Sequence, residues 1–236
     1  MSEFDSGRRR VIQALGAGLL MPSLAPAVIA SVKDRPQLTD GVQSGDLQGD
    51  KAIVWSRCDR PARMVVEWDT RSLFPNPRRF VSALTDARSD FTARVDLTGL
   101  PADQAIFYRV QFEDAQSGVA SEPWFGHLRS VPQTRRDIRF VWSGDTAGQG
   151  YGINPDIGGM RIYEAMRLRL PDFFIHSGDT IYADGPIPAQ LLTEGGRVWR
   201  NITSEAKSRV AKSLDDFRGN YRYNLMDENI RRFNAE

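Results

Sequence analysis

The sequence predicts a β-sandwich followed by an incomplete α/β domain. Short β-rich runs separated by turn residues continue up to residue 130, as in antiparallel sandwiches. From residue 138 the pattern changes to strand, glycine-rich loop, helix and strand, which is typical of α/β proteins. The chain has 236 residues, so about 100 remain for this second domain, fewer than a domain of this kind usually needs.

The composition narrows the functional classes. Because 31 Lys+Arg residues face 30 Asp+Glu residues, the net charge is +1, which excludes a polybasic nucleic-acid binder. The single cysteine, Cys58, excludes an intrachain disulfide framework and a thiolate metal cluster, and we expect it to be a half-buried strand residue. Two histidines, His127 and His176, are too few for a histidine-rich metal site within this chain.

The N-terminus has the order of features expected of an export signal. The pair Arg8-Arg9 is followed by one variable residue and the apolar Val11-Ile12, which resembles a twin-arginine signal. A weakly apolar stretch interrupted by glycine and proline follows, too broken for a membrane-spanning helix. We therefore expect residues 1–30 to be a twin-arginine signal peptide, cleaved after Ala27 or Ala30. The alternative is a basic N-terminal helix with no targeting role.

Residues 41–130 are expected to form the sandwich. Residues 91–97 alternate between apolar and polar side chains, as in a half-buried strand. The segment 95–101, which leads to Tyr108, resembles the corner before a late strand of a fibronectin type III domain. Tyr108 is then expected to be buried and to hydrogen-bond back to that corner. The expected strands are at residues 52–57, 62–68, 79–84, 91–97, 106–112 and 124–128, and a polar linker is expected at 131–137.

Two aspartates follow the two strands of the α/β unit. Strands are expected at 138–143 and 173–176, the second buried on both faces, with a helix at 160–170 between them. On that helix Ile162, Met166 and Leu170 would form the apolar face. Gly144-Asp145 and Gly178-Asp179 would then meet at the carboxyl edge of a parallel sheet, where such sheets bind ligands.

Two carboxylates a few ångströms apart repel each other, so Asp145 and Asp179 indicate a cation site. The alternative is that both aspartates cap loops or the following helix. Tyr182 lies three residues beyond Asp179 and favours the metal, because a phenolate is a hard ligand suited to Fe(III). His176 is interpreted as a hydrogen-bonded core histidine rather than a catalytic one.

The motif Gly178-Asp179-x-x-Tyr182 resembles the second metal motif of calcineurin-like metallophosphoesterases, including purple acid phosphatases and, more closely, PhoD-type alkaline phosphatases. Further segments resemble the PhoD type as well, so the resemblance extends over nearly the whole chain. They are residues 41–46 with 54–57 (the opening of the N-terminal domain), 140–145 (the first metal-binding strand) and 216–225 (the helical segment before the third motif).

The resemblance implies an exported enzyme that hydrolyses small phosphomonoesters, and often diesters, with one Fe(III) and one or more Ca²⁺. It implies that Asp145 binds iron, that Asp179 bridges the metals and that Tyr182 binds iron as phenolate. Some members of the family have cysteine where this chain has Asp145, which changes the electronic properties of the iron. The implied partners are phosphate ester substrates and the twin-arginine export machinery. The mature protein would be periplasmic or secreted, without a membrane anchor, and would bind nucleic acid only as a diester substrate.

Residues 138–236 are accordingly expected to be the N-terminal part of a metallophosphatase domain, and the chain alone is expected to lack phosphatase activity. Residues 204–236 are predicted to be helical, with Val210, Leu214 and Phe217 on an apolar face that too little sheet is present to cover. The alternative from another functional class is an exported, non-catalytic β-sandwich binding module with a vestigial α/β tail.

Overall fold

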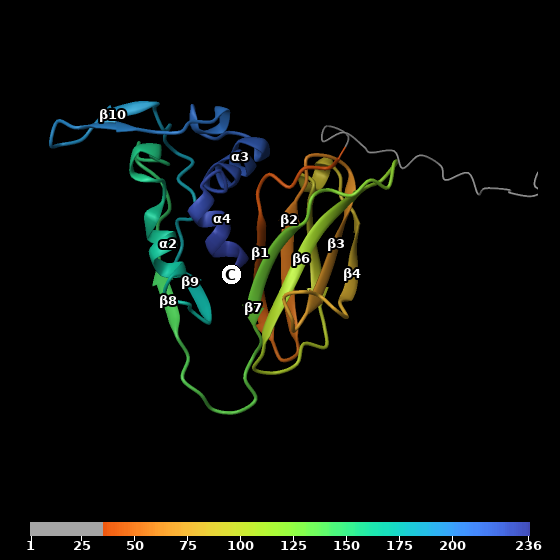
Figure 1. Cartoon of the computed structure of the whole chain (residues 1–236). Helices are drawn as coiled ribbons and strands as arrows, with labels where there is room; N and C mark the ends of the chain where they lie inside the picture. Colours follow the sequence, from red (N-terminus) through yellow and green to blue (C-terminus); the bar gives the residue numbers. More distant parts are fainter. Residues whose placement is uncertain (1–34) are drawn as a thin grey trace, which may run out of the picture. The chain divides into compact units, whose positions relative to one another are not determined.

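The computed structural model describes residues 35–236, and the predicted signal peptide at 1–30 lies outside the described residues. The first part of the described chain consists of strands (Figure 1). These are β1 (Val42–Gln48), β2 (Lys51–Arg57), β3 (Ala62–Asp69), β4 (Arg78–Leu84), β5 (Thr92–Leu97), β6 (Ala105–Asp114) and β7 (Trp124–Arg129).

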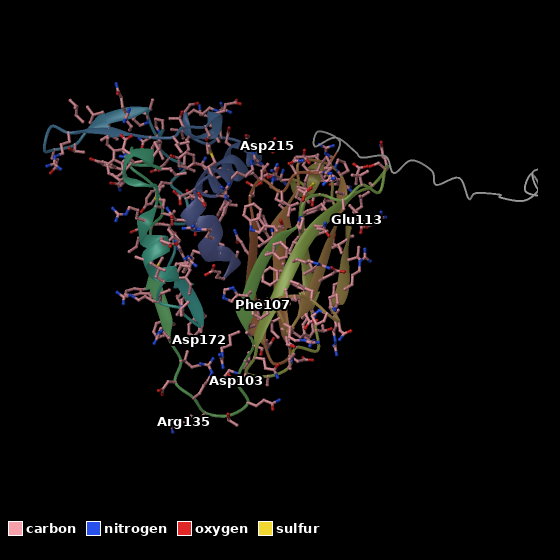
Figure 2. All side chains as sticks on the ribbon, viewed as in Figure 1. Asp103, Phe107, Glu113, Arg135, Asp172 and Asp215 are labelled. Carbon is pink, nitrogen blue, oxygen red and sulfur yellow. The ribbon has the colours of Figure 1, made fainter. Side chains whose placement is uncertain are left out.

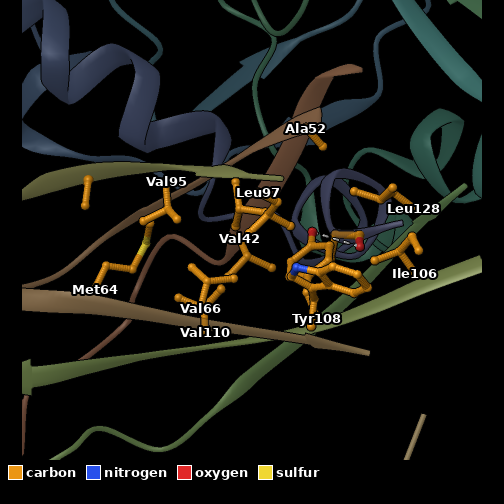
Figure 3. Close-up of a cluster of buried hydrophobic side chains, with 14 of the residues drawn as sticks. Val42, Ala52, Met64, Val66, Val95, Leu97, Ile106, Tyr108, Val110 and Leu128 are labelled. Carbon is orange, nitrogen blue, oxygen red and sulfur yellow. Dashed lines mark hydrogen bonds between the residues drawn. The ribbon is translucent and has the colours of Figure 1, made fainter. Parts of the chain in front are cut away.

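These strands form two antiparallel sheets around one apolar core. The sheet orders are β1-β2-β5 and β4-β3-β6-β7. Alternate side chains are buried, as in β6, where Ile106, Tyr108, Val110 and Phe112 point inward. Both sheets contribute to the same buried cluster, part of which Figure 3 shows. The mostly β architecture predicted for this region is confirmed.

Each strand predicted for residues 52–128 is present, but β1 is not among the predicted runs. The sequence of β1, Val42-Gln43-Ser44-Gly45-Asp46-Leu47-Gln48, is mostly polar and has a glycine in its middle, so it shows no period-two alternation. Its pairing with β2 is interrupted by a register shift between Gly45 and Gln48. The sheet pairing, rather than the local sequence, therefore determines this strand.

Cys58 lies one residue beyond β2 and is completely buried rather than half-buried. Burial raises the pKa of its thiol to about 11, because a thiolate would lose its hydration. A thiol that stays protonated at neutral pH is a poor nucleophile and metal ligand, so Cys58 contributes packing rather than chemistry.

A parallel strand pair begins the second part of the chain. β8 (Phe140–Ser143) and β9 (Phe173–His176) pair in parallel, and α2 (Arg161–Arg167) lies between them in the sequence. The helix is shorter than the predicted 160–170, since Leu170 has a φ of 49° and is outside it. Its buried residues are Tyr163 and Met166, so the predicted face through Ile162 and Leu170 is wrong.

The prediction that β9 is buried on both faces is also wrong. Phe173 is 46% exposed and Ile175 is 44% exposed, whereas Phe174 packs against the cluster that contains α2 and α4. Phe140 and Phe173 stack on the open face, with ring centroids 5.4 Å apart. Within residues 35–236 this sheet has two strands, and the side chains of one face, Phe140, Trp142, Phe173 and Ile175, are exposed.

The remaining elements are a short hairpin and helices. β10 (Gln190–Leu192) and β11 (Val198–Arg200) pair in antiparallel fashion and were not predicted. The helical character predicted for 204–236 is confirmed by the 3₁₀ turn η4 (Glu205–Lys207) and by α3 (Leu214–Asn224) and α4 (Glu228–Ala235). A reciprocal capping box of Ser213 and Asp216 begins α3. Val210, Leu214 and Phe217, predicted to form an apolar face, are exposed.

The last helix packs on the β-sheet core. Ala235 belongs to the same buried cluster as Tyr108, and the Tyr108 hydroxyl donates a hydrogen bond of 3.2 Å to the Ala235 carbonyl. The prediction that the Tyr108 hydroxyl bonds to the corner at residues 95–101 is therefore wrong. The corner carbonyl of Pro101 already accepts a hydrogen bond from the Ser130 hydroxyl.

Ion pairs of Arg136 hold the predicted linker, residues 131–137, in place. Arg136 donates to the carboxylates of Asp103 at 3.0 Å and of Asp172 at 2.7 Å, so it joins a turn of the β-sheet region to the segment before β9. Figure 2 labels both aspartates beside the linker that carries Arg135. Among residues 35–236, no helix has the length and apolar character needed to cross a membrane.

Replacing Tyr108 with phenylalanine tests the contact between α4 and the core. The variant leaves the Ala235 carbonyl without its donor in a buried place, and the free energy of unfolding should fall by about 1–3 kcal/mol. Urea denaturation followed by circular dichroism measures this change. Tyr221→Phe, at a tyrosine that is 52% exposed, is the matched control. Equal effects of the two substitutions would contradict the proposed importance of this hydrogen bond.

Candidate metal centre

The parallel register of β8 and β9 brings the two predicted aspartates together. Ser143 pairs with His176 at the ends of the strands, and the backbone pairing continues into the loops beyond them. There the amide of Asp145 donates to the Gly178 carbonyl at 3.1 Å, and the amide of Thr146 donates to the Asp179 carbonyl at 2.9 Å. Asp145 and Asp179 therefore lie side by side at the carboxyl edge of the sheet, as the sequence predicts.

Both aspartates have the same unusual backbone conformation. Their φ angles are each 53°, in the left-handed region, and Gly178 before the second one has a φ of 108°. Aspartate tolerates this region better than most residues, although it still costs free energy. Strained conformations of this kind are concentrated at functional sites, where the surrounding structure maintains them.

Tyr182 places a third oxygen beside the two carboxylates. Its hydroxyl lies 2.8 Å from Oδ1 of Asp145 and 3.1 Å from Oδ2 of Asp179, and it can donate its proton to either carboxylate. The structure thus brings together all three residues predicted from the sequence. The hydrogen bond to Asp145, then the loss of hydration and then the hydrogen bond to Asp179 raise the pKa of the Tyr182 phenol well above its usual range, because a phenolate would be less hydrated and would face two negative charges.

A bound cation would reverse this effect, since its positive charge would stabilise the carboxylates and a phenolate together. The donors are hard anionic oxygens, which suit Fe(III) and Ca²⁺, so their chemistry fits the metals that the resemblance implies. Within residues 35–236 there is no group of three or more His, Cys, Asp or Glu side chains placed to hold a metal ion. The candidate site among the described residues is therefore a set of two carboxylates and one phenol.

Gly148 makes room for the tyrosine ring. A Cβ atom placed at residue 148 would overlap with Cδ2 and Cγ of Tyr182, so any larger side chain would displace the phenol. The sequence shows several glycines in this loop, but spacing alone does not indicate which of them faces a functional side chain.

A hydrogen-bonded chain underneath the two loops holds them in register. The Thr146 hydroxyl lies 2.9 Å from Nε2 of His176 and 2.7 Å from the Tyr163 hydroxyl. The Gly178 amide donates to Nδ1 of His176 at 3.3 Å, so this nitrogen is the unprotonated one and the ring proton is on Nε2. His176 thus contacts the loop of each aspartate and has a structural role, although it is half-buried rather than in the core. Thr146 carried no signal in the sequence.

Comparison with known proteins gives matches along most of the chain. Residues 23–132 match the model of the PhoD-like phosphatase N-terminal domain, and residues 140–236 match that of the PhoD-like phosphatase. A search of curated proteins finds no match.

Among solved structures, the chain is similar to one described as the structure of PhoD, with a TM-score of 0.66 and 19% identity over 84% of this chain. The chain spans 37% of the length of that structure. A second similar structure is a purple acid phosphatase from yellow lupin (Lupinus luteus) seeds, with a TM-score of 0.49 and 15% identity over 64% of this chain and 30% of the other.

The substitution Gly148→Ala tests the geometry of the three-oxygen set. The new methyl group must push the Tyr182 ring away from the aspartates, so the affinity for Fe(III) should fall by about tenfold or more. Isothermal titration with chelated iron measures it. Gly185→Ala is the matched control, because nothing lies within 4 Å of a Cβ at residue 185. If both variants bind iron as the unsubstituted protein does, the assignment of Tyr182 as a ligand is wrong.

Proposed function

The chain belongs to the PhoD-like phosphatase family, and on this premise we propose that it is part of an exported, metal-dependent phosphoric ester hydrolase. The observation that carries the proposal is the convergence of Asp145, Asp179 and Tyr182 at one edge of the β8–β9 sheet. Because the chain spans 37% of the solved PhoD structure, the activity is proposed for the whole protein.

The proposed architecture follows the predicted domains. The strand orders β1-β2-β5 and β4-β3-β6-β7 support a fibronectin type III-like sandwich at 41–130, because they split consecutive strands between two antiparallel sheets. The parallel pair β8–β9 with α2 between its strands supports the beginning of an α/β metallophosphatase domain at 138–236. The signal peptide at 1–30 would direct the protein through the twin-arginine machinery to the periplasm or the outside of the cell.

In the proposed centre Asp145 and Tyr182 would hold Fe(III), and Asp179 would provide a carboxylate for the iron and for a Ca²⁺ ion. When bound, the metals supply a Lewis acid for the phosphoryl oxygens and lower the pKa of a bound water to give a hydroxide nucleophile. The two carboxylates contribute fixed negative charge, and Tyr182 would bind as a phenolate after releasing to solvent the proton that it otherwise donates to a carboxylate. His176 contacts the loops of both aspartates and would keep them at the spacing that a shared metal requires.

Small phosphate esters are the proposed substrates, and the described residues do not separate monoesters from diesters. The alternative of a non-catalytic binding module with a vestigial tail is less well supported. A tail without a role has no reason to keep two aspartates in left-handed conformations beside one tyrosine hydroxyl.

Replacing Tyr182 with phenylalanine in the full-length protein tests the iron assignment. The iron-loaded unsubstituted protein should show a visible phenolate-to-Fe(III) absorption band, and Tyr182→Phe should lose it because no phenolate remains. Tyr221→Phe should keep the band. Hydrolysis of p-nitrophenyl phosphate and of bis(p-nitrophenyl) phosphate should depend on added metal and stop after chelation. An unsubstituted, iron-loaded protein without the band would contradict the iron assignment.

Replacing Arg8 and Arg9 together with lysine tests the proposed export route. The export machinery would no longer recognise the arginine pair, and the precursor should accumulate in the cytoplasm, as fractionation and immunoblotting would show. Replacing Arg63 and Arg71 with lysine, far from the signal, serves as the control. Undiminished export of the Arg8→Lys, Arg9→Lys protein would rule out the twin-arginine route.

A further inference from the structure

Lys207 is a completely buried lysine beside the candidate metal centre. It has 0% exposure, and its ammonium nitrogen donates a hydrogen bond of 2.8 Å to the backbone carbonyl of Tyr182. The same nitrogen lies 5.5 Å from the centroid of the Tyr223 ring, in a cation–π contact. The lysine side chain therefore ends between a buried aromatic ring and the backbone of a predicted metal ligand.

Burying this charge is costly, and no close carboxylate compensates for it. The ion pairs found within residues 35–236 do not include Lys207, and Asp184 contributes only a more distant attraction. Desolvation lowers the pKa of Lys207, which is the expected sign for an ammonium without a close anion. An apolar side chain of similar length would fill the same space at lower cost, so packing does not account for a lysine here.

The contacts of Lys207 close the loop that carries Tyr182. Its backbone carbonyl accepts a hydrogen bond of 2.7 Å from the amide of Ile187, while its side chain holds the carbonyl of Tyr182. The ends of the loop 182–187 are therefore both attached to the single residue at the end of η4. Ser204 caps η4 and keeps Lys207 in place.

Asn224 holds the same loop two residues earlier. Asn224 is the last residue of α3. Its side-chain amide donates a hydrogen bond of 2.6 Å to the Thr180 carbonyl. The carbonyls of Thr180 and Tyr182 are thus each held by a buried polar side chain. Fixing the backbone at Tyr182 fixes the direction of its side chain, and metal ligands need to be held within about 0.5 Å of their working positions.

We propose that Lys207 is a positioning residue for the metal centre: its ammonium group holds the Tyr182 carbonyl so that the phenol oxygen stays between Asp145 and Asp179. The inference rests on the proposed function, because it assigns a role in the same site. Lys207 touches neither the metal nor the substrate in this account and acts through the backbone of Tyr182.

The test compares Lys207→Met with Lys212→Met in the full-length protein, because Lys212 is exposed and belongs to the same segment. Removing the buried charge offsets the lost hydrogen bond, so both variants should denature at similar urea concentrations. Lys207→Met alone should weaken or shift the Fe(III)–phenolate band and lower the affinity for Fe(III) by about tenfold. In the metal-free protein it should also speed amide hydrogen exchange in residues 180–187.

The inference is overturned if Lys207→Met matches Lys212→Met in the band, the iron affinity and the exchange rates. An unsubstituted protein without the band removes the proposed iron centre and the inference with it, whereas a normal band that Lys207→Met leaves unchanged removes the inference alone. If Lys207→Met does not fold, Lys207→Gln replaces it, since glutamine also removes the charge and is too short to restore the same contact. The same comparison then decides the outcome.

Discussion

Two carboxylates held side by side repel each other unless a proton or a cation lies between them. The arrangement of side chains at the carboxyl edge of the β8–β9 sheet depends on this constraint. The parallel pairing of β8 with β9 places Asp145 and Asp179 at one edge, and the backbone hydrogen bonds beyond the strands prevent them from moving apart. In the structure the Tyr182 hydroxyl lies between them and can donate its one proton to either carboxylate. A cation at this position would take over that role, which supports the proposed metal centre.

Hydrogen bonds and ion pairs of the surrounding elements hold the carboxyl edge of the β8–β9 sheet in place. His176 and Thr146 join the two loops from below, and Tyr163 on α2 continues the same chain of hydrogen bonds. On the other side, α3 is attached to the β-sheet region through Asp90, whose carboxylate accepts from Arg57 on β2 and Arg222 on α3. The helices that hold the Tyr182 loop are therefore themselves anchored to the larger β-sheet core.

Sequence patterns predicted the elements that have strong local signals. The strands of the first half, the helices near the end and the three ligand candidates Asp145, Asp179 and Tyr182 could be predicted because alternation, helical spacing of apolar residues and motif spacing are local properties. β1 and the hairpin β10–β11 could not be predicted, because their residues become strands only through pairing. The predicted face of α2 was wrong for two reasons: Leu170 lies beyond the end of the helix, and Tyr163 rather than Ile162 packs with Met166 in the core. The supporting roles of Gly148, Thr146 and Lys207 depend on contacts with distant segments, which spacing does not encode.

The central claim is that Asp145, Asp179 and Tyr182 bind one metal ion together. Anomalous diffraction at the iron absorption edge, from crystals of the iron-loaded full-length protein, tests it most directly. The account predicts an anomalous peak within coordination distance of the Tyr182 phenol oxygen and of a carboxylate oxygen from each aspartate. A strong peak elsewhere with none between these three oxygens would contradict it.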